Sequence, residues 1–234
     1  MNKKTKFSVC FLMLLLVLTS CCNMPRLLPD NSLPEGFVYV KDAIPEAIID
    51  MRYYGNDNFI GRRIDGYHAP VAILSQEATF ALRKANEEFN KLGYSIKIFD
   101  TYRPQQAVND FVIWAADPDD VKMKSSYYPS VDKKDLFAEG YIARRSGHTR
   151  GSTVDLTIVS NRTGLELDMG SPFDFFGPIS HHRNDMITQE QASNRAFLRG
   201  VMENAGFRAY ELEWWHYTLE NEPHPDTYFD FPVR

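Results

Sequence analysis

Residues 146–158 read SGHTRGSTVDLTI and place a histidine, a glycine and an aspartate close together. From Thr153 to Ile158, apolar and polar side chains alternate, which predicts a strand. Asp155 then lies on the face opposite to the apolar residues, where we expect it to point away from the core. Gly151 offers a bend that would fold His148 back over Asp155, so that both side chains reach one metal ion.

A second run of residues suited to metal binding and catalysis, ELEWWHY, occupies positions 211–217. It is expected to contribute His216 as the third ligand. Two histidines, one carboxylate and an open fourth position form the ligand set of a catalytic zinc, one ion per chain. Zinc in such a site activates water and polarises the scissile carbonyl. A carboxylate must take up the proton, and Glu213 is the candidate base. On a straight strand Glu213 and His216 would face opposite ways, so a turn, bulge or strand end is expected between them.

Each of these residues also has a simpler interpretation. A single histidine is more often a packing residue than a ligand, and Asp155 could instead cap a turn. A serine triad of Ser146, His148 and Asp155 is disfavoured, because a serine two residues from its histidine rarely points at it productively. The other histidines are interpreted as structural. The His181–His182 pair near Asp174 could instead contact the metal ligands without binding the ion itself.

The rest of the chain predicts a mixture of helices and strands. The expected elements are a helix capped by Ser75 and ended by Gly93, a strand from Tyr94 that delivers residues 100–103, a helix from Pro104 to about Ala116, a helix with a Thr188–Gln191 capping box that stops at Gly206, and a strand-like aromatic run over residues 207–217. Because helices and strands do not alternate strictly, we expect an α+β fold, with one domain built on an antiparallel sheet flanked by helices.

The first residues predict a targeting signal rather than a part of the fold. Residues 1–20 carry three lysines before a short apolar run, as a secretory signal does. The sequence LTSC ending at Cys21 resembles a bacterial lipobox, so a lipid on Cys21 would attach the protein to a membrane outside the cytoplasm, on the periplasmic side. An ordinary signal peptide is the alternative. Residues 21–35 are expected to form a tether and residues 36–234 the zinc-binding catalytic domain.

Charge and cysteine content exclude two classes of protein. Without residues 1–20, which carry three lysines and no acid, the formal net charge falls from −5 to −8. Nucleic acid is therefore not an expected partner, because phosphate binding needs a basic surface. All three cysteines lie in or beside the signal, which excludes a cysteine protease.

Taken together, the motifs make the chain resemble the D-alanyl-D-alanine metallopeptidases, and within them the D-Ala-D-Ala dipeptidases of the vancomycin-resistance type. The similarity begins near Phe37. The motifs that recur in order are RYYGNDNFIG at 52–61, DGY at 65–67, DTYRP at 100–104, the block at 146–155, MGSPFD at 169–174 and EWWH at 213–216.

This resemblance implies a fold and a zinc site like those of hedgehog domains. It also implies a role for each matched residue. It implies that His148, Asp155 and His216 bind zinc and that Glu213 is the general base. Arg103 would stabilise the carbonyl oxygen as it gains charge. Asp174 and Tyr53 would hold the free amine of the substrate, and Ser146 would contact its terminal carboxylate.

The function implied is hydrolysis of the small dipeptide D-Ala-D-Ala to two D-alanines in cell-wall peptide turnover. The chain departs from the family at Thr153, where a small alanine is usual, and in its expected export, since the resistance enzymes are cytoplasmic. Salvage of dipeptide released in the envelope is therefore the preferred role. The alternatives are a D,D-carboxypeptidase or endopeptidase that acts on longer stem peptides, and a non-catalytic zinc-containing binding module.

Overall fold

A five-stranded sheet forms the centre of the computed structural model, which describes residues 33–234. Its strand order is β2-β4-β5-β7-β6, and a separate two-stranded sheet pairs β1 with β3. The strands are β1 (Phe37–Tyr39), β2 (Ile48–Ile49), β3 (Ile73–Ser75), β4 (Tyr94–Asp100), β5 (Thr153–Ser160), β6 (Phe207–Ala209) and β7 (His216–Leu219). Neighbouring strands are antiparallel except for the short parallel pair β2 and β4, so the expected α+β fold is confirmed with one parallel edge.

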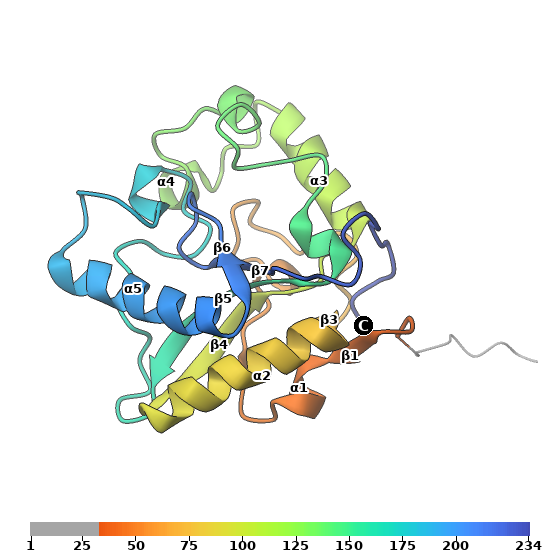
Figure 1. Cartoon of the computed structure of the whole chain (residues 1–234). Helices are drawn as coiled ribbons and strands as arrows, with labels where there is room; N and C mark the ends of the chain where they lie inside the picture. The colour runs from red at the N-terminus through yellow and green to blue at the C-terminus, as the bar shows by residue number, and fades with distance from the viewer. Residues whose placement is uncertain (1–32) are drawn as a thin grey trace, which may run out of the picture. The chain divides into compact units, whose positions relative to one another are not determined.

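Helices cover both sides of this sheet. The α-helices are α1 (Val40–Ala43), α2 (Gln76–Lys91), α3 (Gln105–Ala116), α4 (Lys124–Tyr127) and α5 (Gln189–Asn204), and the 3₁₀ turns are η1 (Arg52–Tyr54), η2 (Lys133–Asp135), η3 (Gly147–Arg150) and η4 (Pro178–Ser180). Figure 1 shows α2 and α5 side by side along one face, at the bottom of the view, with α3 and α4 at the top. The rings of Phe89 and Phe197 join α2 to α5 at 5.6 Å.

The helix boundaries follow the capping signals in the sequence. The Ser75 side chain accepts a hydrogen bond from the backbone of Ala78 and opens α2, as predicted. Thr188 and Gln191 form the predicted capping box at the start of α5. Helix α3 starts at Gln105, one residue later than expected, because Pro104 lies at its N-cap in an extended conformation.

Asp155 does not point away from the core as expected, because the second face of β5 is also covered. The alternation along β5 is present, yet all its residues but the last are buried, and Asp155 is only 2% exposed. An aromatic layer lies over this face: Phe173 stacks on Phe99 of β4 at 4.8 Å, and Trp215 packs edge-on against Phe173. A strand covered on both faces surrounds its polar side chains with protein rather than water.

The aromatic run from Phe207 to Tyr217 is not one strand, so that expectation is wrong. It folds as a hairpin in which β6 pairs with β7 and residues 210–215 form the turn. The backbone of Tyr210 donates to the carbonyl of His216, which closes this turn. The bend expected between Glu213 and His216 is therefore present, and it lies where β7 begins.

The C-terminal residues hold the loop that follows β4 in place through ring stacking and hydrogen bonds. The rings of Tyr102 and Phe231 stack at 4.0 Å, and the Tyr102 hydroxyl donates to the carbonyl of Phe231 at 2.9 Å. The backbone of Gln105 donates to the carbonyl of Phe229 at 3.1 Å. These contacts fix the loop on both sides of Arg103.

The expected signal at residues 1–20, the lipid-carrying Cys21 and most of the expected tether at 21–35 lie outside the described residues. Within residues 33–234, no helix combines the length and the apolar character needed to cross a bilayer.

Candidate active site

Sheet register brings two of the three expected ligands together. Asp155 on β5 and His216 on β7 are direct cross-strand partners, and side chains in such a pair start about 5 Å apart. The ring of His148 reaches them from η3, just before β5. The Nε2 atom of His148 lies 3.2 Å from Asp155 Oδ2, and Nδ1 of His216 lies 3.1 Å from Asp155 Oδ1. One ligand atom from each residue falls within 4.8 Å of the other two.

These donor atoms fit a divalent cation. Burial lowers the pKa of His148, and its Nδ1 lies 2.7 Å from the carbonyl of Thr101, so Nδ1 carries the proton and Nε2 keeps its lone pair. Burial opposes ionisation of Asp155, but the adjacent His148 and His216 bring its pKa below the usual range. The Oδ1 atom of Asp155 is buried and makes no well-aligned hydrogen bond, although Nδ1 of His216 lies 3.1 Å from it. Two nitrogens and one carboxylate oxygen form a ligand set that suits zinc.

Gly151 is the bend that turns the chain from His148 into β5, as expected. Its φ of +84° is left-handed, a conformation that glycine adopts without steric cost. A Cβ at this position would lie 2.3 Å from the ring of Phe37, and the Gly151 carbonyl accepts a hydrogen bond from the backbone of Ser75. The loop that carries His148 is therefore packed directly against β1.

Replacing Gly151 with alanine should destabilise the domain by about 2–4 kcal/mol, because a positive φ and a clash with a buried ring act together. Urea denaturation of the variant measures this loss. The matched control is Gly164→Ala, since Gly164 also has a positive φ of +71° but nothing within 4 Å of its Cβ position. Equal losses in the two variants would show that contact with Phe37 does not matter.

Glu213 lies beside the ligands because the hairpin turn is anchored on both sides. Its Oε2 atom is 3.4 Å from Nδ1 of His216. The next residue, Trp214, donates its backbone N–H to the carbonyl of Ser180 and its indole N–H to the hydroxyl of Ser171, both at 3.0 Å. Burial raises the pKa of Glu213 to about 7, a range suited to a base that accepts and returns a proton at neutral pH.

Arg103 is held over the site in a fixed orientation. Its Nε donates to Asp100 at 2.9 Å, and its Nη2 lies 3.7 Å from Asp155. The guanidinium also lies 4.9 Å above the ring of Tyr53 and 5.1 Å from that of Phe111. A planar donor fixed in this way can stabilise negative charge without first having to reorient.

Asp174 and Tyr53 form a hydrogen-bonded pair on another wall of the site. The Tyr53 hydroxyl donates to Oδ2 of Asp174 at 2.8 Å. Asp174 is 5% exposed and is the only non-glycine residue between 33 and 234 with a positive φ, at 59°. Burial, followed by the charge of Asp155, raises the pKa of Asp174 well above its usual range. A cationic group placed here would restore its negative charge.

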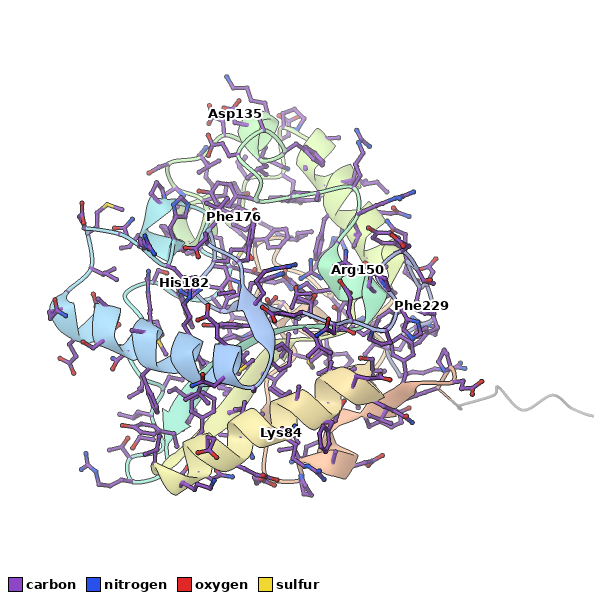
Figure 2. All side chains as sticks on the ribbon, in the orientation of Figure 1. Lys84, Asp135, Arg150, Phe176, His182 and Phe229 are labelled. Carbon is purple, nitrogen blue, oxygen red and sulfur yellow. The ribbon has the colours of Figure 1, made fainter. Side chains whose placement is uncertain are left out.

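All eight predicted site residues line one cavity of about 200 Å³. They are Tyr53, Arg103, Ser146, His148, Asp155, Asp174, Glu213 and His216. Figure 2 labels Phe176, which belongs to the apolar part of the same lining, together with Tyr141 and Phe111. The cavity is smaller than the several hundred Å³ typical of pockets for drug-sized ligands, so it suits a small molecule.

Asp100 is the main site residue that the sequence analysis missed. It is fully buried, accepts a hydrogen bond from the Tyr67 hydroxyl at 2.6 Å, and lies 3.5 Å from Nδ1 of His148. A register shift in β4 between Ile98 and Asp100 places Asp100 opposite Asp155. The three-residue spacing from Asp100 to Arg103 was the available signal, because a carboxylate that close to a buried arginine is a natural partner.

Two other expectations concern residues around the site. Neither His181 nor His182 lines the cavity; His182 packs against the ring of Tyr217 at 6.0 Å, and Figure 2 shows it near α5. Both agree with a structural role. Thr153, the departure from the family pattern, places its hydroxyl 2.9 Å from that of Thr218 on β7. The extra polar group is thus paired, on the same face of β5 as Asp155.

The chain is similar to several known proteins. Residues 34–234 match the peptidase M15 family described as D-ala-D-ala dipeptidase. A D-alanyl-D-alanine dipeptidase of Enterococcus faecium is 44% identical over 199 residues, which cover 85% of this chain and 98% of that protein. One from Streptomyces coelicolor is 43% identical over 197 residues, with coverage of 84% and 98%. Among solved structures, the LdcB LD-carboxypeptidase overlaps 83% of this chain and 72% of its own, at 18% identity and a TM-score of 0.41.

Proposed function

Because the chain belongs to the D-Ala-D-Ala dipeptidase family of the M15 peptidases, we propose that it hydrolyses D-Ala-D-Ala to two molecules of D-alanine in a zinc-dependent reaction. The observation that supports this most strongly is the convergence of His148, Asp155 and His216 within 4.8 Å, with Glu213 next to them. A cation bound there supplies activation of water and polarisation of the peptide carbonyl.

The residues around the ligands transfer the proton, stabilise the developing charge and bind the two ends of the substrate. Glu213 takes the proton from the attacking water and returns it to the leaving amine, while Arg103 donates to the carbonyl oxygen as that oxygen becomes negative. The Asp174–Tyr53 pair receives the free ammonium group of the dipeptide. Ser146 lies at the carboxylate end, where its hydroxyl accepts from the backbone of His148 at 3.2 Å and keeps its own proton for donation.

The metal proposal predicts a stability change that can be measured apart from turnover. Zinc at about 100 times its dissociation constant stabilises a folded protein by about 2.7 kcal/mol, which corresponds to a Tm increase of about 5–10 °C for a domain of this size. His148→Ala should abolish this increase, whereas His68→Ala should not, because His68 is exposed and outside the cavity. An unchanged zinc response in His148→Ala would argue against the ligand assignment.

The substrate is tested by comparing D-Ala-D-Ala with an N-acyl-D-Ala-D-Ala stem peptide in the presence of zinc. A dipeptidase needs the free ammonium group, since burial of Asp174 next to an uncharged acyl group leaves its ionisation uncompensated. We expect release of D-alanine from the dipeptide at a much higher kcat/KM than from the acylated peptide. The opposite preference would indicate a D,D-carboxypeptidase, and zinc binding without turnover would indicate a binding module.

We also propose that the protein is exported and attached to the envelope by a lipid on Cys21, with residues 36–234 forming the peptidase domain outside the cytoplasm. The lysines before the apolar run and the LTSC sequence support this, as does the position of all cysteines within the first 22 residues. Cell-wall peptide turnover in the envelope would then supply the dipeptide. Cys21→Ser should move the protein from the membrane fraction to the soluble fraction, and unchanged fractionation would contradict the anchor.

A further inference from the structure

The charges that line the cavity differ in whether they already have partners. The ionisable acids there are Asp155, Asp174 and Glu213, and the arginines are Arg103 and Arg145. Arg103 already has a carboxylate partner in Asp100. The side chain of Arg145 forms no hydrogen bond or ion pair with any residue between 33 and 234, and Arg145 is exposed. Arg145 is therefore a cation at the cavity without a protein anion among the described residues.

An aromatic ring supports Arg145 from outside the cavity. Its guanidinium lies 4.9 Å from the centre of the Tyr228 ring, and Arg150 lies near the same ring at 5.9 Å. The nearby carboxylate of Glu222 is already used by Arg150, through contacts of 2.8 and 2.7 Å. Figure 2 shows Arg150 near Phe229, beside the C-terminal segment that carries Tyr228. Stacking on a flat ring limits the freedom of Arg145 and leaves the edge of its guanidinium free to donate.

The position of Arg145 also matches one end of a zwitterionic dipeptide. Arg145 precedes Ser146, whose hydroxyl proton is free to donate, whereas the acid that suits the ammonium group is Asp174 on another segment. A dipeptide carries one carboxylate, and Arg103, the other arginine of the cavity, is already paired with Asp100. A guanidinium matches a carboxylate geometrically and loses less hydration than an ammonium group when the two pair.

We infer that Arg145 receives the terminal carboxylate of the substrate and makes the enzyme selective for peptides with a free C-terminus. This inference rests on the proposed dipeptidase function and names a specificity-determining residue within it. Arg145 recognises the end of the substrate and takes no part in proton transfer.

The test compares D-Ala-D-Ala with its C-terminal amide, which has the same shape without the negative charge. Hydrolysis of both is measured with the zinc-loaded protein and its Arg145→Gln, Arg145→Lys and Arg144→Gln variants. Arg144 is the matched control, because it is the exposed neighbour, rests on the ring of Phe137 and does not line the cavity. Arg145→Gln should lower the preference for the acid over the amide by about threefold to tenfold, mainly through KM.

Each outcome decides a different point. Loss of the preference in Arg145→Gln, with most of it kept in Arg145→Lys and all of it in Arg144→Gln, supports the inference. An unchanged preference in Arg145→Gln overturns it, as does an equal loss for both substrates, which would mean that Arg145 shapes the cavity rather than binding the carboxylate. If the unaltered protein hydrolyses neither compound, the proposed function fails first and this inference fails with it.

Discussion

Replacing Glu213 with glutamine should lower kcat by a factor of about 10²–10⁴, the usual contribution of a positioned general base. Glutamine keeps the shape of the side chain, so the contact with His216 and the anchored turn stay in place while the proton acceptor is lost. KM should change little, because the carboxylate acts on the water and not on the bound dipeptide. Steady-state kinetics with D-Ala-D-Ala measures both constants.

Glu211→Gln is the matched control for this variant. Glu211 lies in the same turn but is exposed and paired with Arg199 at 2.8 Å, so its replacement should leave kcat unchanged. Zinc content, measured on all proteins, separates loss of the base from loss of the metal. Full activity in Glu213→Gln with normal zinc content would contradict the assigned base.

The same carboxylate should make the activity of the enzyme decrease at acidic pH. Only ionised Glu213 accepts a proton, so kcat/KM should decrease as the pH falls through its pKa. Burial raises that pKa to about 7, and a bound cation would favour the ionised form and move this decrease to lower pH. A pH–rate profile with zinc present locates this decrease. In Glu213→Gln the remaining activity should lack it.

Replacing Arg103 with lysine should lower kcat by a factor of about 10²–10³, as loss of one donor to a developing oxyanion does. Lysine keeps the charge but has no planar group to donate to Asp100 while also facing the reacting carbonyl. The loss should appear in kcat more than in KM, because the oxygen gains charge only in the transition state.

Arg62→Lys controls for a general effect of arginine replacement. Arg62 also pairs with an aspartate through two nitrogens, at 2.7 and 2.6 Å from Asp110, but it does not line the cavity. Its replacement should leave kcat unchanged. A loss confined to KM in Arg103→Lys would show instead that Arg103 binds the ground state.

The convergence of His148, Asp155 and His216 could be predicted from sequence because local signals mark these residues. A glycine between His148 and a clearly alternating strand marks the bend, and the run at residues 211–217 carries His216 close to Glu213. The helix starts at Ser75 and Thr188 were equally local, since a cap depends on neighbouring residues only. Such features depend little on the rest of the fold.

Other features depend on contacts between distant segments and left weaker signals. The second face of β5 is covered by an aromatic layer to which the distant Phe173 belongs, and the position of Asp100 depends on a register shift that no short pattern reveals. The support of Arg145 by Tyr228 joins two loops that are far apart in sequence. Residue types at these positions are compatible with many surroundings, so only the folded chain identifies their partners.

The pairing of Asp155 with His216 across β5 and β7 has a consequence for how the enzyme matures. A shift of β7 by one residue would turn Tyr217 toward the ligands and His216 into the apolar layer, so burial of the core already rejects the wrong alignment. The donor atoms are thus preorganised by folding itself. Little ordering entropy would remain to be lost on binding of the proposed metal ion, so the chain can fold first and acquire that ion afterwards.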